Sequence, residues 1–381
     1  MDTKRVITFT QELIRERSLS GEEQNVIARV VAEMKSVGFD QVWIDENGSA
    51  IGVINGAKPG QTLLLDGHVD TVQAHASDWT YDPFAATIHD GYLYGRGVCD
   101  MKGSVAAMIH AAASVDRANL AGRVAVSATV SEEVMEGITI RTVMDAVKPD
   151  AVIIGEATEF TINRGGRGRA EIVIETVGKS AHSSSPQAGL CAVHEMMRVI
   201  HAIEILPLPV DPAVGEAQLC LTDIVSVPYP GHSVVPNRCR VSYDRRLVPG
   251  ETPESVLASL RDLPELQGVQ YSLIVLDGIE KTSTGKTLQA LKFFPAWAFA
   301  EDHPLVTAAS AGLSKAGFET RLGAYRFCTN GAHSAGVAGV PTIGFGPGKE
   351  TDAHTVNERM LVSELERAAE GYLAIIQSVL S

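Results

Sequence analysis

Histidine and carboxylate side chains gather at a few points of the sequence, each where a run of apolar residues ends. His68 and Asp70 follow a run of three leucines, and the adjacent pair Glu132 and Glu133 follows the segment VAVSATV. Similar groups come near other apolar runs: Asp100, Glu156, Asp352 and His354. Imidazole and carboxylate groups together are ligands of borderline divalent metals, Zn²⁺ above all. The pattern therefore predicts a metal centre.

The adjacent pair Glu132 and Glu133 suggests two roles at such a centre. Neighbouring side chains at a strand end point in opposite directions. One carboxylate can then bind metal while the other handles protons beside a water whose pKa falls towards ~7. A carboxylate can also bridge two ions roughly 3.5–4 Å apart.

Each of these elements also has a purely structural explanation. The sequence His-x-Asp is frequent in surface loops, a Glu-Glu pair is usually solvated, and Asp100 could cap the helix that follows it. His354 could be an exposed loop residue. Taken singly these explanations are preferable, but their shared position at strand ends favours the metal centre.

The elements that must position these residues alternate along the first part of the chain. Apolar strands are expected at 61–66, 123–130 and 150–155, with a helix at 22–39 before them and helices at 103–115 and 138–147 between them. Ser20 and Glu23 form a capping-box pattern before the first of these helices. Apolar strands separated by helices indicate a mostly parallel sheet covered on both faces, whose ligands bind beyond the carboxyl ends of the strands. The basic stretch NRGGRGR at 163–169 is expected to be a loop or hinge.

After residue 166 the pattern changes to alternating strands and two helices. Their order, strand–helix–strand–strand–helix–strand, is that of a ferredoxin-like split βαβ module. Thr252 is the expected N-cap of its second helix. We therefore expect an α/β catalytic domain formed by residues 1–166 and 291–381, with an α+β module at 167–290 inserted between them.

Composition excludes several classes of protein. The formal net charge is −14, which disfavours a nucleic-acid partner. No stretch reaches the ~20 apolar residues of a membrane span, and the charged N-terminus does not resemble a signal peptide. Five scattered cysteines without a CxxC pair argue against a disulfide framework and favour a reducing compartment, so a cytoplasmic location is expected.

Five ordered motifs resemble those of the M20 metallopeptidase and deacylase family: LLLDGHVDTV, YGRGVCDMKG, VSEEVMEG, IIGEATE and AHTVNE. That family includes acetylornithine deacetylase, succinyl-diaminopimelate desuccinylase, carboxypeptidase G2-like enzymes and many dipeptidases. The stretches YDRRLVPGET and FCTNGAHSAG are most similar to a subgroup of hydrolases linked by name to selenium metabolism. The resemblance spans nearly the whole chain, and the inserted module matches the family's lid or dimerisation domain.

The resemblance implies a complete set of ligands for two divalent cations, Zn²⁺ first and Co²⁺ or Mn²⁺ as alternatives: His68 and Glu156 for one ion, Glu133 and His354 for the other, and Asp100 as the bridge. Glu132 would be the general base. Asp70 would hydrogen-bond the far nitrogen of His68 and fix its ring. The peptide bond between Asp100 and Met101 would be cis. Cys99 and Cys328 are expected to be small buried residues near the site.

The resemblance also implies substrate contacts. His182 would reach the partner's active site in a homodimer and stabilise the oxyanion there. Arg246 would bind a substrate carboxylate, and Arg245, on the other face of the strand, would form a salt bridge. Ser233, Asn330 and Gly331 would line the substrate pocket, where this sequence departs from its relatives.

These expectations converge on a dimetal hydrolase that cleaves the amide bond of a small N-acyl or N-carbamoyl amino acid. Hydroxide generated at the metal pair would attack the carbonyl group, with Glu132 as the base. A dipeptidase or aminopeptidase shares all the metal residues and stays open as an alternative. A binding protein that keeps the fold without the chemistry is disfavoured by the full ligand set, and neither nucleic acid nor a membrane is expected as a partner.

Overall fold

A computed structural model describes residues 1–264 and 266–381 and divides the chain into two compact units. Unit 1 comprises residues 1–166, 279–289 and 297–381, and unit 2 comprises residues 167–278 and 290–296. The first boundary coincides with the one expected from sequence, whereas the second does not.

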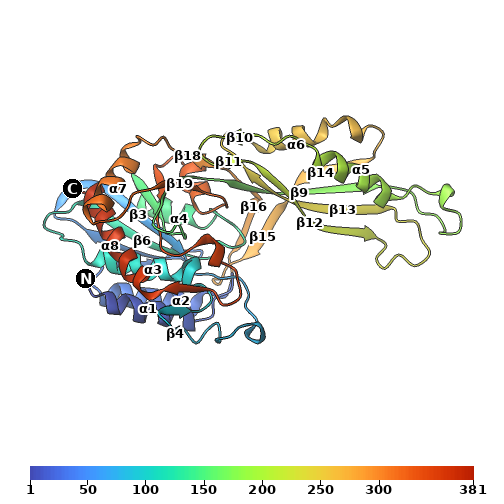
Figure 1. Cartoon of the computed structure of the whole chain (residues 1–381). Coiled ribbons are helices and arrows are strands. Elements are labelled where there is room, and N and C mark those ends of the chain that lie inside the picture. Colours follow the sequence, from blue (N-terminus) through green and yellow to red (C-terminus); the bar gives the residue numbers. More distant parts are fainter. The chain divides into compact units, whose positions relative to one another are not determined.

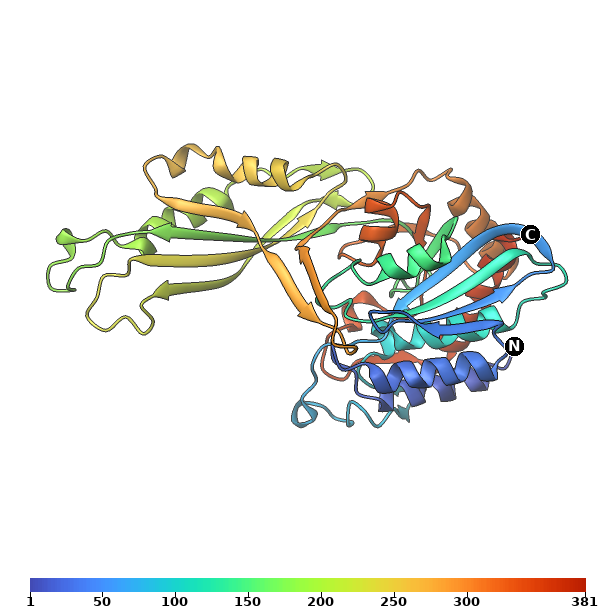
Figure 2. The same ribbon diagram turned by 180° about the vertical axis from the view of Figure 1, so that it is seen from behind.

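Unit 1 is built around a nine-stranded mixed sheet with the order β1-β2-β6-β3-β7-β20-β8-β18 and with β19 beside β8. Figure 1 labels its strands β3, β6, β18 and β19. Its strands are β1 (Gln41–Ile44), β2 (Ala50–Asn55), β3 (Lys58–His68), β6 (Ala121–Thr129), β7 (Ala151–Ile154), β8 (Ile162–Gly166), β18 (Trp297–Ala298), β19 (Leu322–Tyr325) and β20 (Thr342–Gly344). β3 is parallel to both β6 and β7, and β20 is parallel to β7. β3 and β6 lie side by side in Figure 2. The central strands thus have the predicted parallel arrangement, while β1 and β2 form an antiparallel hairpin.

Helices cover both faces of this sheet. They are α1 (Thr3–Arg15), α2 (Gln24–Ser36), α3 (Gly103–Ala113), α4 (Ile140–Val147), α7 (Pro304–Lys315) and α8 (Val362–Val379). Leu63 and Leu65 of β3 belong to the large core beneath α1, α3 and α8, whereas Leu64 packs in a second core with α4. Because both faces are buried here, residues 63–65 of the strand are continuously apolar instead of alternating.

The hairpin of β15 (Asp277–Lys281) and β16 (Thr287–Leu291) explains the shifted boundary. Its turn is hydrogen-bonded to the N-terminal part of unit 1. The carbonyl oxygen of Ser283 accepts a hydrogen bond from the side chain of Gln24, and the hydroxyl of Thr284 donates one to the carbonyl oxygen of Glu46. Residues 279–289 therefore belong to unit 1 and not to the inserted module, as the expected boundary at residue 290 had placed them.

Unit 2 has a sheet with the order β12-β13-β9-β14, flanked by helices α5 (Ala192–Glu204) and α6 (Pro253–Arg261). Its strands are β9 (Gly168–Val177), β12 (Gln218–Val227), β13 (Arg238–Leu247), β14 (Tyr271–Val275) and β17 (Phe293–Phe294), with a small hairpin of β10 (Val210–Asp211) and β11 (Gly215–Glu216). The chain order β9–α5–β12–β13–α6–β14 is the expected split βαβ pattern. Thr252 caps α6 as predicted, since its side chain accepts the N–H of Ser255.

A small sheet of β4 (Thr87–His89), β5 (Tyr92–Tyr94) and β21 (Arg359–Leu361) completes unit 1. The stretch 163–169, expected to be a loop or hinge, is not a loop: it lies in β8 and β9 on either side of Arg167, where the division between the two units falls. All five cysteines carry free thiols. Among the described residues, no helix is both long and apolar enough to cross a membrane.

Candidate active site

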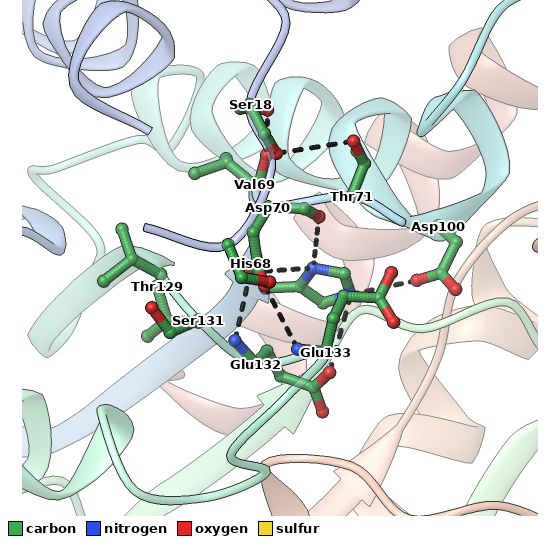
Figure 3. Close-up of polar contacts among 12 residues, drawn as sticks. Ser18, His68, Val69, Asp70, Thr71, Asp100, Thr129, Ser131, Glu132 and Glu133 are labelled. Carbon is green, nitrogen blue, oxygen red and sulfur yellow. Dashed lines mark hydrogen bonds and ion pairs between the residues drawn. The ribbon is translucent and has the colours of Figure 1, made fainter. Parts of the chain in front are cut away.

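The predicted ligands lie at the carboxyl ends of neighbouring parallel strands in unit 1. His68 is the last residue of β3, and Glu132 and Glu133 follow β6 (Figure 3). Glu156 follows β7. His354 lies on the loop after β20. Asp100 lies in η2 (Val98–Lys102), a short distorted helical segment directly before α3.

Asp100 lies between two histidines. Its Oδ1 atom is 2.9 Å from His68 Nε2, and its Oδ2 atom is 3.0 Å from His354 Nε2. Each carboxylate oxygen thus faces a different imidazole, as a carboxylate does when it bridges two ions.

The other carboxylates complete two groups around these rings. Glu156 Oε1 is 3.4 Å from His68 Nε2, and Glu133 Oε2 is 3.0 Å from His354 Nε2. Glu132 Oε2 is 4.0 Å from His68 Nε2, and its Oε1 atom is buried without a hydrogen-bond partner among the described residues. The structure therefore brings the five predicted ligands and Glu132 into one cluster.

Burial and mutual repulsion shape the electrostatics of this cluster. Burial and neighbouring carboxylates raise the pKa of Glu132 well above its usual range, and burial together with the charge of Asp100 raises the pKa of Glu133 and brings that of Glu156 to about 7. Hydrogen bonds with Asp100 and Glu133 raise the pKa of His354 to about 10. The cluster holds more negative charge than its imidazoles can balance.

Divalent cations fit this cluster in both spacing and charge. Ligands of one Zn²⁺ ion lie roughly 3–3.5 Å from each other, since each lies about 2.0–2.2 Å from the metal. The separations of 2.9–3.4 Å between the imidazole and carboxylate atoms match that spacing. Ligand atoms of His68, Asp100 and Glu133 lie within 4.8 Å of one another, and so do those of His68, Glu132 and Glu156. Glu132 is thus also close enough to be a ligand.

Asp70 holds the segment that carries the two glutamates. Its Oδ1 atom accepts the N–H of Glu132 and its Oδ2 atom accepts the N–H of Glu133, each at 3.1 Å (Figure 3). The expected hydrogen bond to the far nitrogen of His68 is instead made by the main-chain carbonyl of Asp70, at 2.9 Å from Nδ1, while the carboxylate lies 3.4 Å away. Both the carbonyl and the carboxylate of Asp70 therefore lie beside His68 Nδ1, and the carboxylate also binds the main chain after β6.

Glu358 has a similar role towards Asp100, and sequence reasoning missed it. Its Oε1 atom accepts the N–H groups of Cys99 and Asp100, and its Oε2 atom accepts that of Gly97 and a bond from Arg96. The motif AHTVNE ends with this residue, so the family motif included Glu358, but the sequence did not indicate what it does. The peptide bond after Asp100 is cis, as predicted. Cys99 is buried, and its thiol donates a hydrogen bond to the main-chain carbonyl of Lys349.

Ser20 and Glu23 do not form the predicted capping box. Helix α2 begins at Gln24 without a side-chain cap. Ser20 instead donates a 2.7 Å hydrogen bond to Asp70 Oδ2, and Glu23 Oε1 accepts the N–H of Ser131 at 3.1 Å. The same residue types that cap a helix are used here to bind loops distant in sequence.

Asn330 and Gly331 were expected to contact substrate, and their surroundings argue otherwise. The amide nitrogen of Asn330 donates to Asp66 and Thr129, and its Oδ1 atom accepts the N–H of Gly137. A Cβ atom on Gly331 would lie 2.6 Å from the indole nitrogen of Trp297. Both residues are engaged in internal packing, and the amide of Asn330 has its hydrogen-bonding atoms occupied by protein.

His182 and Ser233 lie on exposed segments of unit 2. His182 Nδ1 accepts the N–H of Ser184 at 3.1 Å, so in the neutral ring the proton resides on Nε2. The carbonyl of Ser233 accepts the N–H of Ser183, and the backbone of Ser233 is left-handed with φ 53°.

Arg245 and Arg246 point to opposite faces of β13. Arg245 is buried and pairs with Glu251, as predicted. Arg246 is 29% exposed, and its Nε atom lies 2.8 Å from Asp244, a carboxylate that also binds Arg169. The Arg246 guanidinium therefore keeps part of its surface accessible.

Comparison with known proteins identifies the family. Residues 64–378 match the model of Peptidase family M20/M25/M40. The chain belongs to this family. As a member of the M20/M25/M40 family it is a hydrolase of amide or peptide bonds. Among curated relatives of this chain, the uncharacterized protein YgeY of Escherichia coli strain K12 is 33% identical over 96% of this chain and 92% of its own length. Acetylornithine deacetylase of Vibrio atlanticus is 29% identical over 88% of this chain and 86% of its own length.

Solved structures share the fold of this M20/M25/M40 member. Aminopeptidase PepT from Bacillus cereus superposes with a TM-score of 0.79 at 20% identity, covering 100% of both chains. The YxeP protein of Bacillus subtilis, described as a dinuclear metal-binding peptidase of family M20, gives 0.72 at 16% identity, with 99% and 98% covered. At these identities the similarity concerns the fold.

Proposed function

We propose that this chain is a two-cation hydrolase that cleaves the amide bond of a small N-acyl or N-carbamoyl amino acid. The observation that carries the proposal is the position of Asp100, whose two oxygens face His68 and His354 on opposite sides. His68 and Glu156 would hold one ion, and Glu133 and His354 the other.

Two divalent cations at these residues would polarise the substrate carbonyl and lower the pKa of water. Zn²⁺ suits the imidazole and carboxylate donors, with Co²⁺ or Mn²⁺ as alternatives. Glu132 is the group left to handle protons, because its Oε1 atom is buried beside the ligands and has no partner among the described residues. It would take a proton from the attacking water and deliver it to the leaving nitrogen.

Residues of unit 2 would supply substrate recognition. Arg246 would bind a substrate carboxylate, for which the planar guanidinium is suited. With its proton on Nε2, His182 could donate a hydrogen bond to the oxyanion that forms during attack. Ser233 is kept as a third candidate contact.

A homodimer formed through unit 2 would let His182 act in the partner's site. Strand β12 is at the edge of its sheet and carries exposed apolar side chains, among them Ile224, Val225 and Val227. Such an edge favours pairing with another chain. Co-expression of His182→Ala with Glu132→Gln tests this, because a mixed dimer would hold one intact site and should recover roughly a quarter of wild-type activity. No recovery in isolated mixed dimers would reject the role in trans.

The proposed chemistry is tested by exchanging the two adjacent glutamates. Glu132→Gln should keep both ions and lose turnover by about 10²–10⁴-fold, since a general base contributes that much. Glu133→Gln is the matched control and should lose ion binding as well. Metal content and kcat are measured together, and wild-type turnover by Glu132→Gln would refute the assignment.

The alternative is a dipeptidase or aminopeptidase, which would use the same ions and the same base. A panel of N-acyl amino acids, N-carbamoyl amino acids and dipeptides, offered to the metal-loaded protein, separates the two. The selenium-linked subgroup and a cytoplasmic location remain predictions from the sequence.

A further inference from the structure

The main-chain N–H groups of three consecutive residues, Ser131, Glu132 and Glu133, donate hydrogen bonds to buried carboxylates. Asp70 accepts those of Glu132 and Glu133, and Glu23 accepts that of Ser131. Glu23 also accepts the hydroxyl of Ser131 at 3.3 Å and the N–H of Gly21 at 2.9 Å. The segment that carries the proposed base and a proposed ligand is thus fixed at each residue.

Ser131 is where the chain turns from β6 towards Glu132 and Glu133. Its backbone is left-handed, with φ 55°, a conformation that non-glycine residues rarely adopt. Such a conformation persists only where its surroundings enforce it. Both the N–H and the hydroxyl of Ser131 donate to Glu23 Oε1, and these two hydrogen bonds can hold the left-handed conformation in place.

The fold of α2 does not require a glutamate at position 23. The residue precedes the helix without making a side-chain cap, and its side chain is 0% exposed. Its Oε2 atom is buried with no partner among the described residues. Burying a carboxylate in this way disfavours the folded state, so the residue needs a compensating role.

We infer that Glu23 is a positioning residue of the active site: it holds Ser131 in the left-handed conformation and so orients Glu132 as base and Glu133 as ligand. This inference rests on the proposed function. Its consequence is that residues before β1, far from the ligands in sequence, help determine ion affinity.

The experiment compares variants that differ in the acceptor at position 23. Glu23→Met fills the same space without an acceptor, and Glu23→Asp keeps the charge but is one methylene too short. Both should weaken Zn²⁺ binding, followed by calorimetric titration with Zn²⁺ alone, by about tenfold or more and lower kcat by a similar factor, as for other residues that support metal ligands. Glu23→Gln keeps an acceptor oxygen and should stay close to wild type. Glu33→Met, a buried carboxylate of α2 that pairs with Arg5, is the matched control and should leave affinity and kcat unchanged.

A second substitution separates positioning from general support of the fold. Glycine adopts the left-handed conformation freely, so adding Ser131→Gly to either weakened variant should restore most of the lost affinity. Wild-type affinity in Glu23→Asp, or no restoration by Ser131→Gly in a folded double variant, would overturn the inference. If the wild-type chain binds Zn²⁺ but hydrolyses no compound of the panel, the proposed function fails while the titration still decides the role of Glu23.

Discussion

In unit 1 the segments that carry Glu132, Glu133 and Asp100 have main-chain N–H groups bound by buried carboxylates, whereas in unit 2 the candidate substrate residues lie on exposed or half-exposed surface. Asp70 and Glu358 each bind two or more such N–H groups in unit 1. His182 and Ser233 are exposed, and Arg246 pairs with a carboxylate of its own strand. The difference suggests that one unit fixes the chemistry while the other can vary its substrate.

The largest effect should come from the bridging position. Asp100→Asn removes the charge between His68 and His354, and we expect the chain to lose at least one ion and activity to fall about a thousandfold or more, because a catalytic ion contributes several kcal/mol. Metal content and kcat are the measurements. Asp90→Ala, a change at an exposed carboxylate of the same unit, should alter neither.

A smaller effect is expected when the ligands are kept and the hydrogen bonds from the main chain of Glu132 and Glu133 to Asp70 are weakened. Asp70→Asn replaces one acceptor oxygen by a donor that faces a main-chain N–H, so ion affinity or kcat should fall about 10–100-fold. Asp150→Asn provides the control, because Asp150 also accepts a main-chain N–H, that of Thr62, away from the ligands. Equal results for the two variants would show that bracing by carboxylates is not specific to the site.

The pair on β13 tests the other side of the comparison. Arg246→Ala should raise KM about tenfold or more with unchanged metal content, since a hydrogen bond to a charged group contributes about 1.5–3 kcal/mol. Arg245→Ala should instead lower the free energy of unfolding by about 3 kcal/mol, because it leaves the Glu251 carboxylate without its partner. A loss of ions in Arg246→Ala would contradict the division of roles.

The smallest effect is expected at the cap of α6. Thr252→Ala removes the acceptor for the N–H of Ser255 and should cost about 1 kcal/mol of stability. Kinetic constants should be unchanged, as measured beside a denaturant titration. A change in kcat would mean that local stability in unit 2 limits turnover.

Much of the site was predictable because strand ends are visible in sequence. Apolar runs mark the parallel strands, and the residues just beyond them must share one edge of the sheet, which is how His68, Glu133 and Glu156 could be grouped in advance. Asp100 and His354 lie outside the strands but were grouped at the same edge of the sheet, and the role of each as a metal ligand depended on the family resemblance.

The bracing was not predictable from local pattern. A Ser followed three residues later by Glu fits a capping box, and only the tertiary structure shows that Ser20 and Glu23 bind Asp70 and Ser131 instead. Asn330 likewise could be either a substrate contact or an internal hydrogen-bonding residue, and sequence alone does not reveal that Asp66, Thr129 and Gly137 surround it.

The position of Ser20 and Glu23 in the chain has a practical consequence. The region that matches the family model starts at residue 64, downstream of both. A protein truncated to that region would keep every proposed ligand. It would lose the Ser20 hydroxyl that donates to Asp70 and the Glu23 carboxylate that accepts from Ser131. Fragments for expression, fusion or domain grafting should therefore keep Ser18, whose carbonyl also accepts the N–H of Thr71, and helix α1 before it, whose apolar side chains belong to the core of unit 1.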